Sequence, residues 1–316
     1  MNKQSTSERK IEISKILLPI AAVVMCIVFS IGNSNFLTLS NWTNIGRQQA
    51  ALLIAAVGQT FVILTGGIDL SQGSLIGFIS VVTADVAIKH GFVYAIITAI
   101  LIGITVGIIQ GTLVAKVRIP AFIVTLGFLN ILRGLAYIYS NGMPISGLPA
   151  AFSDLGADKI LGFPVPLVIA FIILIMAFFS LRYLNIGREI YSVGGNEEAS
   201  RLAGINITKV RVFAYIMSGV LTAIAGFVTT ARVAVGQPTL GEGVQLMSVA
   251  AVVIGGTSMR GGEGNVIKTL LGVIMLALIS NGLNLLRVSS YTQTVVNGVI
   301  IVIAVAIDVL GKRKRD

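Results

Sequence analysis

Few residues in this chain could carry out a chemical reaction. General acid–base catalysis and zinc binding both depend on histidine, cysteine or acidic residues at suitable spacing. The sequence of 316 residues holds one histidine, His90, and one cysteine, Cys26. His90 has no second histidine to complete a zinc site, so we interpret it as a loop residue, and Cys26 as a small residue of a helix core. The sequence therefore predicts that the chain is not an enzyme and binds no metal or cofactor itself.

The chain also lacks the phosphate-binding loop of ATPases, G-x-x-x-x-G-K-[ST]. Its nearest approach is GNVIKT at residues 264–269, where Ile267 precedes Lys268 in place of the glycine. The glycines matter because the loop wraps its backbone N–H groups around the phosphates. If ATP drives a process that involves this chain, another polypeptide must bind the ATP.

A polar segment of residues 186–211, IGREIYSVGGNEEASRLAGINITKVR, separates two long apolar runs. Asn196 is suited to cap the start of a helix, and Glu197 in the first turn complements the helix dipole. Gly204 suits the end of the helix, because glycine readily takes up the left-handed conformation found there. The segment therefore predicts a helix of about two turns over residues 196–203.

The predicted helix has an apolar face with a charged flank. Ala199, Leu202 and Ala203 share one face by their spacing, and Glu198 and Arg201 are charged neighbours beside it. Two interpretations fit this pattern: a docking surface for a soluble partner, or a loop helix that lies on lipid headgroups. The residues that we assign to partner docking are Asn196, Glu197, Glu198, Ala199, Arg201, Leu202 and Gly204.

The composition is that of an integral membrane protein. Hydrophobic residues make up 55% of the chain and charged residues 11%, and the mean hydropathy of +0.93 is far above that of a soluble domain. The apolar runs are continuous rather than alternating, which favours helices over barrel strands in lipid. We therefore expect one transmembrane domain over residues 1–316, an all-α bundle of about ten membrane-spanning helices. The runs are 16–31, 50–65, 74–88, 94–115, 121–139, 166–181, 212–231, 244–254, 266–286 and 294–307.

The formal net charge of +10 reports the orientation of the chain rather than binding to nucleic acid. With the N-terminus inside and about ten spans, most lysines and arginines fall in segments on the inner side, as the positive-inside rule requires. We therefore expect an N-in and C-in arrangement with cytoplasmic tails at residues 1–15 and 311–316. The same orientation places residues 186–211 in the cytoplasm.

Polar residues within predicted spans are costly and often face a cavity. Uncharged amides would suit a sugar, whose hydroxyl groups need donors and acceptors without a compensating charge. They suit hydrogen bonds between helices equally well, and for Arg133 we favour a structural role, snorkelling or pairing with a carbonyl. Asp69 is suited to hold the turn before the next helix, with Ser71 beside it. The candidates for a solute path are Gln59, Asp69, Ser71, Gln110, Asn130, Arg133, Asn281, Asn284, Gln293 and Asn297.

Two glycine-rich patterns concern helix packing and symmetry. Gly103, Gly107 and Gly111 recur every four residues within one span, a stripe that suits close packing within the chain, which we favour, or against a second subunit. An internal echo pairs residues 62–77, VILTGGIDLSQGSLIG, with residues 252–272, VVIGGTSMRGGEGNVIKTLLG. Transporters often contain such repeats, but chance similarity between two glycine-rich loops explains the echo equally well.

Several motifs resemble one family of membrane proteins. The segment GGNEEASRLAGI, residues 194–205, resembles the cytoplasmic coupling loop of permeases of ATP-binding-cassette (ABC) importers, with Glu198 where the usual pattern has alanine. Other motifs resemble the ribose-type sugar permeases among them: residues 62–77, AFIVTLGFLNILRG at 121–134, AAVVIGGTSMRGGEG at 250–264 and NGLNLLRVSSYTQ at 281–293. The resemblance covers nearly the whole chain with the motifs in the family's order.

This resemblance implies a permease subunit of the bacterial plasma (inner) membrane that carries ribose or a similar monosaccharide into the cytoplasm. It also implies an ABC ATPase subunit that holds ATP and Mg²⁺, an extracytoplasmic sugar-binding protein and a second permease subunit, either another copy or a close paralogue. Membrane lipids surround such a subunit. The alternative function is a stand-alone secondary transporter, which needs an ion-coupling acid. Neither Asp69 nor Asp85 is convincingly central for that role.

Overall fold

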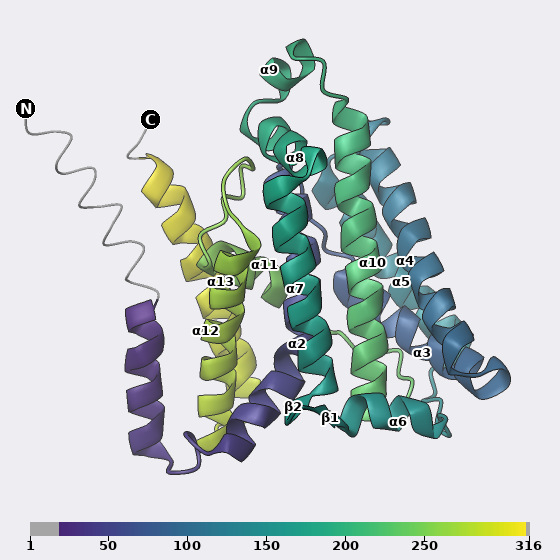
Figure 1. The fold of residues 1–316 in the computed structure, drawn as a ribbon, viewed down its shortest axis with the longest axis vertical. Helices are drawn as coiled ribbons and strands as arrows, with labels where there is room; N and C mark the ends of the chain where they lie inside the picture. The colour runs from purple at the N-terminus through teal and green to yellow at the C-terminus, as the bar shows by residue number, and fades with distance from the viewer. Residues whose placement is uncertain (1–18, 314–316) are drawn as a thin grey trace, which may run out of the picture.

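The structure is a computed structural model that describes residues 19–313, and in that range it is a bundle of α-helices (Figure 1). The predicted tail at residues 1–15 lies outside the described residues, and the tail at 311–316 lies partly outside them. The elements are the helix Pro19–Gly32, α2 (Leu39–Leu64), α3 (Gln72–His90), α4 (Phe92–Ala115), α5 (Ala121–Ser140), α6 (Ala150–Ala157), β1 (Lys159–Ile160), β2 (Phe163–Pro164), α7 (Val165–Tyr183), α8 (Asn185–Gly195), α9 (Glu197–Leu202), α10 (Ile207–Val233), α11 (Val244–Ile254), α12 (Val266–Leu285) and α13 (Ser290–Arg313).

Each predicted apolar run overlaps one of these helices. Among the described residues, seven helices are long and apolar enough to cross a membrane, namely α2, α3, α4, α5, α7, α10 and α12. Three further apolar helices are shorter over the described residues: Pro19–Gly32, α11, and α13 as far as Ile303. The prediction of a helical protein that crosses the membrane several times is therefore confirmed.

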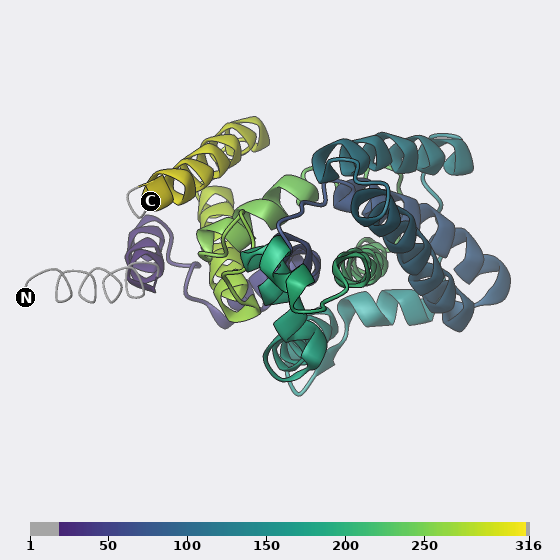
Figure 2. The same ribbon diagram turned by 90° about the horizontal axis from the view of Figure 1, so that it is seen from above.

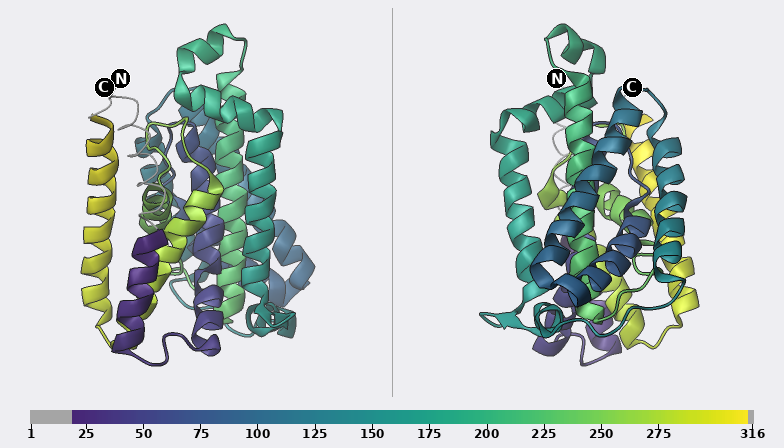
Figure 3. Two further views of the ribbon diagram at one scale, coloured as in Figure 1. Left: turned by 60° about the vertical axis from the view of Figure 1, so that its left-hand side comes forward. Right: turned by 90° about the vertical axis from the view of Figure 1, so that its right-hand side faces the viewer.

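The bundle has two distinct ends and two sides. The short helix α9 projects from one end, and α6 with the β1–β2 hairpin lies at the opposite end (Figure 1). Seen from above, α3, α4 and α5 lie on one side of α10, and α12 and α13 lie on the other (Figure 2). The C-terminal end of α13 lies at the same end of the bundle as α9 (Figure 3).

The glycine stripe of α4 packs against α10 within the chain. A Cβ at Gly107 would lie 2.5 Å from the Cα of Ile216, and one at Gly111 would lie 2.8 Å from the Cα of Val212. The α4 and α10 backbones approach this closely because the stripe carries no side chains. Of the two interpretations left open by the sequence, packing within the chain is confirmed.

Gly107→Ala is expected to lower the thermal unfolding temperature of the protein in detergent. An added Cβ 2.5 Å from the Ile216 Cα must push α4 and α10 apart, and overpacking of this kind costs roughly 1–3 kcal/mol. Gly127→Ala in α5 is the matched control, because a Cβ there meets nothing within 4 Å. Equal unfolding temperatures for the two variants would contradict this account of the stripe.

Candidate functional site

The polar segment forms two short helices at one end of the bundle, α8 and α9 (Figure 1). Asn196 is the N-cap of α9, and its side-chain oxygen accepts a hydrogen bond from the Ala199 N–H at 2.9 Å. The helix ends at Leu202, and Gly204 follows in the left-handed conformation with φ +81°. The predicted capped helix is confirmed, and its role in docking stays a prediction.

Helix α8 was not predicted. Gly187, Ile190 and Val193 are its buried residues, and their spacing of three is the amphipathic signal that could have revealed it. The short length of this signal and the glycines around it hid the helix in the sequence. α8 matters for the site because it is the element from which α9 extends.

The outer face of α9 is exposed to solvent. Ala199, Leu202 and Ala203, predicted to share a face, are all exposed, and the relative exposure of Leu202 is 83%. Ser200 lies on another side of the helix and is buried. The Ser200 hydroxyl lies 2.8 Å from the Ser192 hydroxyl and so joins α9 to α8. The exposed face is therefore held outward by contacts on the inner side.

Ion pairs fix α9 to the start of α10. One carboxylate oxygen of Glu197 lies 3.1 Å from the Arg201 guanidinium, and the other lies 2.6 Å from that of Arg211 in α10. Glu198 pairs with Arg201 at 3.3 Å, as the spacing predicted, although both side chains are largely exposed. Exposed pairs of this kind contribute at most about 1 kcal/mol each. Of the three pairs, Glu197–Arg211 joins α9 to α10, whereas the other two lie within α9.

Below α9, three backbone segments meet with no side chains between them. The Gly262 N–H donates a hydrogen bond to the Leu64 carbonyl at 3.0 Å, and a Cβ at Gly194 would overlap the same carbonyl oxygen. A Cβ at Gly261 would lie 2.8 Å from the Gly66 nitrogen. These segments are the end of α2, the end of α8 and the loop after α11. We call this contact the glycine junction, and it consists of Leu64, Gly66, Gly194, Gly261 and Gly262.

The glycine junction brings together the two halves of the internal echo. Leu64 and Gly66 belong to residues 62–77, and Gly261 and Gly262 belong to residues 252–272. The hydroxyl of Tyr191 in α8 donates to the Gly264 carbonyl at 2.9 Å and adds a further link to the second loop. Burial raises the pKa of the Tyr191 phenol, so the group remains a donor at neutral pH. α8 is thus attached to both echoed loops.

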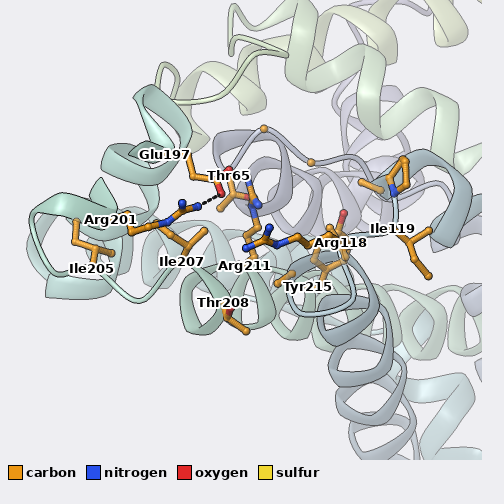
Figure 4. A pocket seen from close by; sticks show the side chains of 16 residues that line it. Thr65, Arg118, Ile119, Glu197, Arg201, Ile205, Ile207, Thr208, Arg211 and Tyr215 are labelled. Carbon is orange, nitrogen blue, oxygen red and sulfur yellow. Dashed lines mark hydrogen bonds and ion pairs between the residues drawn. The ribbon is translucent and has the colours of Figure 1, made fainter. Parts of the chain in front are cut away.

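A cavity of about 520 Å³ opens beside α9 at the same end of the bundle (Figure 4). Arg201 and Glu197 line it from α9, Arg211 lines it from α10, and Arg118 lines it from the turn between α4 and α5. The three guanidinium groups point towards the same space (Figure 4). Residues at the end of α2 and the ring of Tyr215 form another part of the lining. The cavity is therefore mainly basic.

Asp69 is the centre of a buried hydrogen-bond network. One carboxylate oxygen accepts from the Ser71 N–H at 2.9 Å and from the Ser71 hydroxyl at 2.6 Å, and the other accepts from the Ser218 hydroxyl at 2.7 Å. The Gln110 amide donates to the Ser71 hydroxyl at 2.8 Å. The Gln59 amide bonds the backbone N–H and carbonyl of Asp69, both at 3.1 Å. Four candidate path residues are thus joined to one another, and their role towards a solute stays a prediction.

Three further residues of this network were missed by the sequence analysis. The Gln72 amide donates to the Ala55 carbonyl at 3.0 Å and to the Ser218 hydroxyl at 3.2 Å, and its oxygen accepts from Ser248 at 2.6 Å. Gln72, Ser218 and Ser248 are fully buried. Gln72 could have been predicted as part of this network, because it closely follows the polar residues Asp69 and Ser71. Ser218 and Ser248 could not, because each is a single serine within an apolar span. The network ties α3, α4, α10 and α11 to the C-terminal half of α2, through Ala55 and Gln59.

Two candidates lie on α5. The Asn130 amide donates to the Leu126 carbonyl of its own helix at 3.2 Å, and its side chain is exposed. The Arg133 guanidinium donates to the carbonyls of Pro238, Leu240 and Gly73, the last two at 3.4 and 3.3 Å. These bonds join α5 to the loop before α11 and to the start of α3. They are the carbonyl contacts expected for a structural role of Arg133.

The remaining candidates lie towards the end of the bundle opposite α9. Asn281 exchanges hydrogen bonds with Asn41 at 2.8 and 2.9 Å, and the Gln293 amide donates to the Asn284 oxygen at 2.8 Å. Asn297 of α13 lines a cavity of about 710 Å³ between α2, α11 and α13. Asn297 is therefore a candidate that lines a cavity, whereas Asn281, Asn284 and Gln293 make hydrogen bonds to other side chains.

The single histidine, His90, and the single cysteine, Cys26, lie on different helices. His90 is at the end of α3, with its ring 6.3 Å from that of Tyr94, and Cys26 lies in the helix Pro19–Gly32. Within residues 19–313, no group of three or more His, Cys, Asp or Glu side chains is arranged to hold a metal ion.

Comparison with known proteins gives consistent matches. The family described as branched-chain amino acid transport system / permease component matches residues 41–305. The ribose import permease protein of Escherichia coli (strain K12) is 42% identical over 294 residues, 92% of each chain. That of Bacillus subtilis (strain 168) is 42% identical over 288 residues, 90% of this chain and 89% of the relative. The D-allose transport system permease protein of E. coli K12 is 35% identical over 291 residues, 92% of this chain and 89% of the relative. No solved structure matches the chain.

Proposed function

The chain belongs to the family of branched-chain amino acid transport system / permease components, and on this premise we propose that it imports ribose or a similar monosaccharide as the membrane subunit of an ABC importer. The observation that carries this proposal is the 42% identity to ribose import permeases along 92% of both chains. The resemblance to sugar permeases drawn from the motifs is thereby confirmed. The protein is a multi-pass protein of the plasma (inner) membrane.

The proposed substrate class is a neutral sugar. The relatives at 42% and 35% identity are named for ribose and for D-allose, which have five and six carbons but the same kind of hydroxyl groups. Asn130 and Asn297 support this proposal, because they are uncharged amides that face exposed surface or a cavity. We assign the solute path to these two residues before the candidates whose side chains bond residues outside their own helix.

The proposed partner at α9 is an ABC ATPase subunit that holds ATP and Mg²⁺. The exposed Ala199–Leu202–Ala203 face supports this assignment, because it is an apolar surface on the segment that projects from the end of the bundle (Figure 1). The glycine junction and the Glu197–Arg211 pair would pass a displacement of α9 into the bundle. A sugar-binding protein would deliver the solute at the opposite end, and a second permease subunit, a copy or a paralogue, would complete the path.

The proposed topology has about ten passes with both termini in the cytoplasm. The basic residues at the α9 end of the bundle support it, among them Arg118, Arg182 and Arg201. The end that carries α6 has fewer lysines and arginines, which include Lys159 in β1. The C-terminal end of α13 lies at the α9 end, as a C-in arrangement requires (Figure 3).

The test is ribose uptake into vesicles that contain the chain with its ATPase subunit and binding protein. Uptake is expected to require ATP, to be inhibited by vanadate, and to be lost when residues 195–204 are deleted. Full uptake after that deletion, or accumulation of sugar by this chain alone in a proton or sodium gradient, would show the proposal to be wrong. The second result would favour the secondary transporter instead.

Leu202→Asp is expected to weaken binding of the ATPase subunit by about tenfold, because a charge would lie on the apolar docking face. Leu161→Asp is the matched control, since Leu161 is a leucine of similar exposure, 94% against 83%, in the hairpin at the opposite end. Binding measured with both purified subunits in detergent checks this prediction. If both variants bind like the unaltered chain, α9 is not the docking surface.

A further inference from the structure

The basic cavity beside α9 has more positive charge than its own residues neutralise. Its charged lining consists of three arginines, Arg118, Arg201 and Arg211, and one glutamate, Glu197. The Glu197 carboxylate already bonds both Arg201 and Arg211. Glu198 pairs only with Arg201, from outside the lining. The shortage of negative charge is therefore greatest at Arg118.

Within the part of the chain that the structure describes, Arg118 combines an unpaired guanidinium with a left-handed backbone conformation. No hydrogen bond or ion pair joins its guanidinium to another side chain or carbonyl among residues 19–313, and the residue is exposed. Its φ of +65° is in the left-handed region, which costs a non-glycine residue about 1 kcal/mol or more. Arg118 lies in the middle of the turn between α4 and α5, and its guanidinium is directed into the cavity (Figure 4).

We propose that the cavity receives an acidic side chain of the ATPase subunit, with Arg118 as the main contact. This inference rests on the proposed function, because it takes the docking of an ATPase at α9 as given. A carboxylate suits the site, since the planar guanidinium donates two parallel hydrogen bonds to it. Arg211 of α10, whose side chain is 25% exposed and pairs with Glu197, adds a second positive charge to the lining.

The position of the cavity favours this occupant over the phosphate of a lipid headgroup. One wall is α9 itself, which projects beyond the rest of the bundle (Figure 1), so a partner that docks on α9 lies next to the cavity. The lining is mainly polar, whereas a lipid site would continue into an apolar channel for the acyl chains. An acidic residue in this cavity would restrain α9, α10 and the α4–α5 turn together, and so would transmit force to two points of the bundle.

The experiment measures the dissociation constant between the purified chain in detergent and the ATPase subunit. Arg118→Glu is expected to raise it by about tenfold or more, because a like charge would face the acidic side chain. Lys116→Glu makes the same charge change in the same turn, but Lys116 does not line the cavity, so a change within about twofold is expected. Arg118→Gln removes the charge only, and it should flatten the decrease of affinity with added salt. Unchanged unfolding temperatures of all three variants are expected, because Arg118 is exposed.

The outcomes separate this inference from the function on which it rests. If the unaltered chain binds the ATPase subunit and Arg118→Glu binds it equally well, the inference is wrong and the proposed function stands. If the unaltered chain does not bind the ATPase subunit, both are wrong. If the cavity instead binds a lipid phosphate, Arg118→Gln binds the ATPase subunit normally. The unaltered chain is then more active in phosphatidylglycerol than in phosphatidylcholine vesicles, and Arg118→Gln loses this difference. That result would also overturn the inference.

Discussion

Gly194→Ala is expected to abolish ATP-dependent uptake while the chain still binds the ATPase subunit. A Cβ at Gly194 would overlap the Leu64 carbonyl oxygen and would lie 2.5 Å from the Gly262 nitrogen. The glycine junction must then open, which costs the hydrogen bond between Gly262 and Leu64, about 1 kcal/mol, and adds overpacking strain. The α9 face itself is unchanged, so docking should persist. ATP hydrolysis by the complex would then continue without transport.

The control for this prediction is the adjacent residue. Gly195→Ala adds the same methyl group at the end of the same helix, where a Cβ meets nothing within 4 Å. Uptake and ATP hydrolysis are measured on the same vesicles, and the ratio of sugar transported to ATP hydrolysed is compared. If Gly194→Ala and Gly195→Ala give the same ratio as the unaltered chain, the junction does not carry the movement of α9 into the bundle.

Asp69→Ala is expected to be the most destabilising single change in the membrane core. It leaves the Ser71 hydroxyl, the Ser71 N–H and the Ser218 hydroxyl without the carboxylate that accepts from them at 2.6–2.9 Å. Buried donors without a partner cost about 1–3 kcal/mol each, and these bonds connect the loop between α2 and α3 to the start of α3 and to α10. The thermal unfolding temperature of the purified chain in detergent should fall strongly, as should its amount in the membrane.

Asp85→Ala is the matched control for Asp69. Asp85 pairs with Lys89 at 2.9 Å and accepts a hydrogen bond from the Tyr139 hydroxyl at 2.7 Å. Both interactions are solvent-exposed, and exposed ion pairs are worth about 0–1 kcal/mol. A similar loss of stability in both variants would contradict the account of the Asp69 network. Asp69→Asn distinguishes a structural role from a role in ion coupling, because asparagine keeps the size of the side chain but carries no titratable carboxyl group. Normal stability with complete loss of uptake in Asp69→Asn would argue for a coupling acid.

The helices of the bundle could be predicted because the signals that form them are local. A continuous apolar run is enough to require a helix in lipid, and every predicted run overlaps one. The capped helix α9 was predictable for the same reason, since Asn196, Glu197 and Gly204 act within about one turn of their own positions. α8 was missed because its apolar spacing is short and interrupted by glycine.

The partners of each polar or glycine residue could not be predicted. The sequence showed that Gly103, Gly107 and Gly111 form a flat stripe, but not that α10 fills it. It showed Gln59, Asp69, Ser71 and Gln110 as polar groups in apolar surroundings, and a solute path and bonds between helices were equally good explanations. The structure joins these four to each other, which a list of residue types cannot show.

By itself, the sequence determined that this protein is a helical membrane protein, where its long apolar helices lie, where the capped helix α9 begins and ends, and to which family it is similar. Hydropathy, helix caps and charge distribution depend on residues that are close together in the sequence, so they can be identified without knowledge of the tertiary structure. Only the tertiary structure decided that two echoed loops meet at the glycine junction, that Arg118 faces the cavity beside α9, and that the Asp69 carboxylate bonds both the start of α3 and α10. These contacts join residues far apart in the chain, and packing in three dimensions selects them.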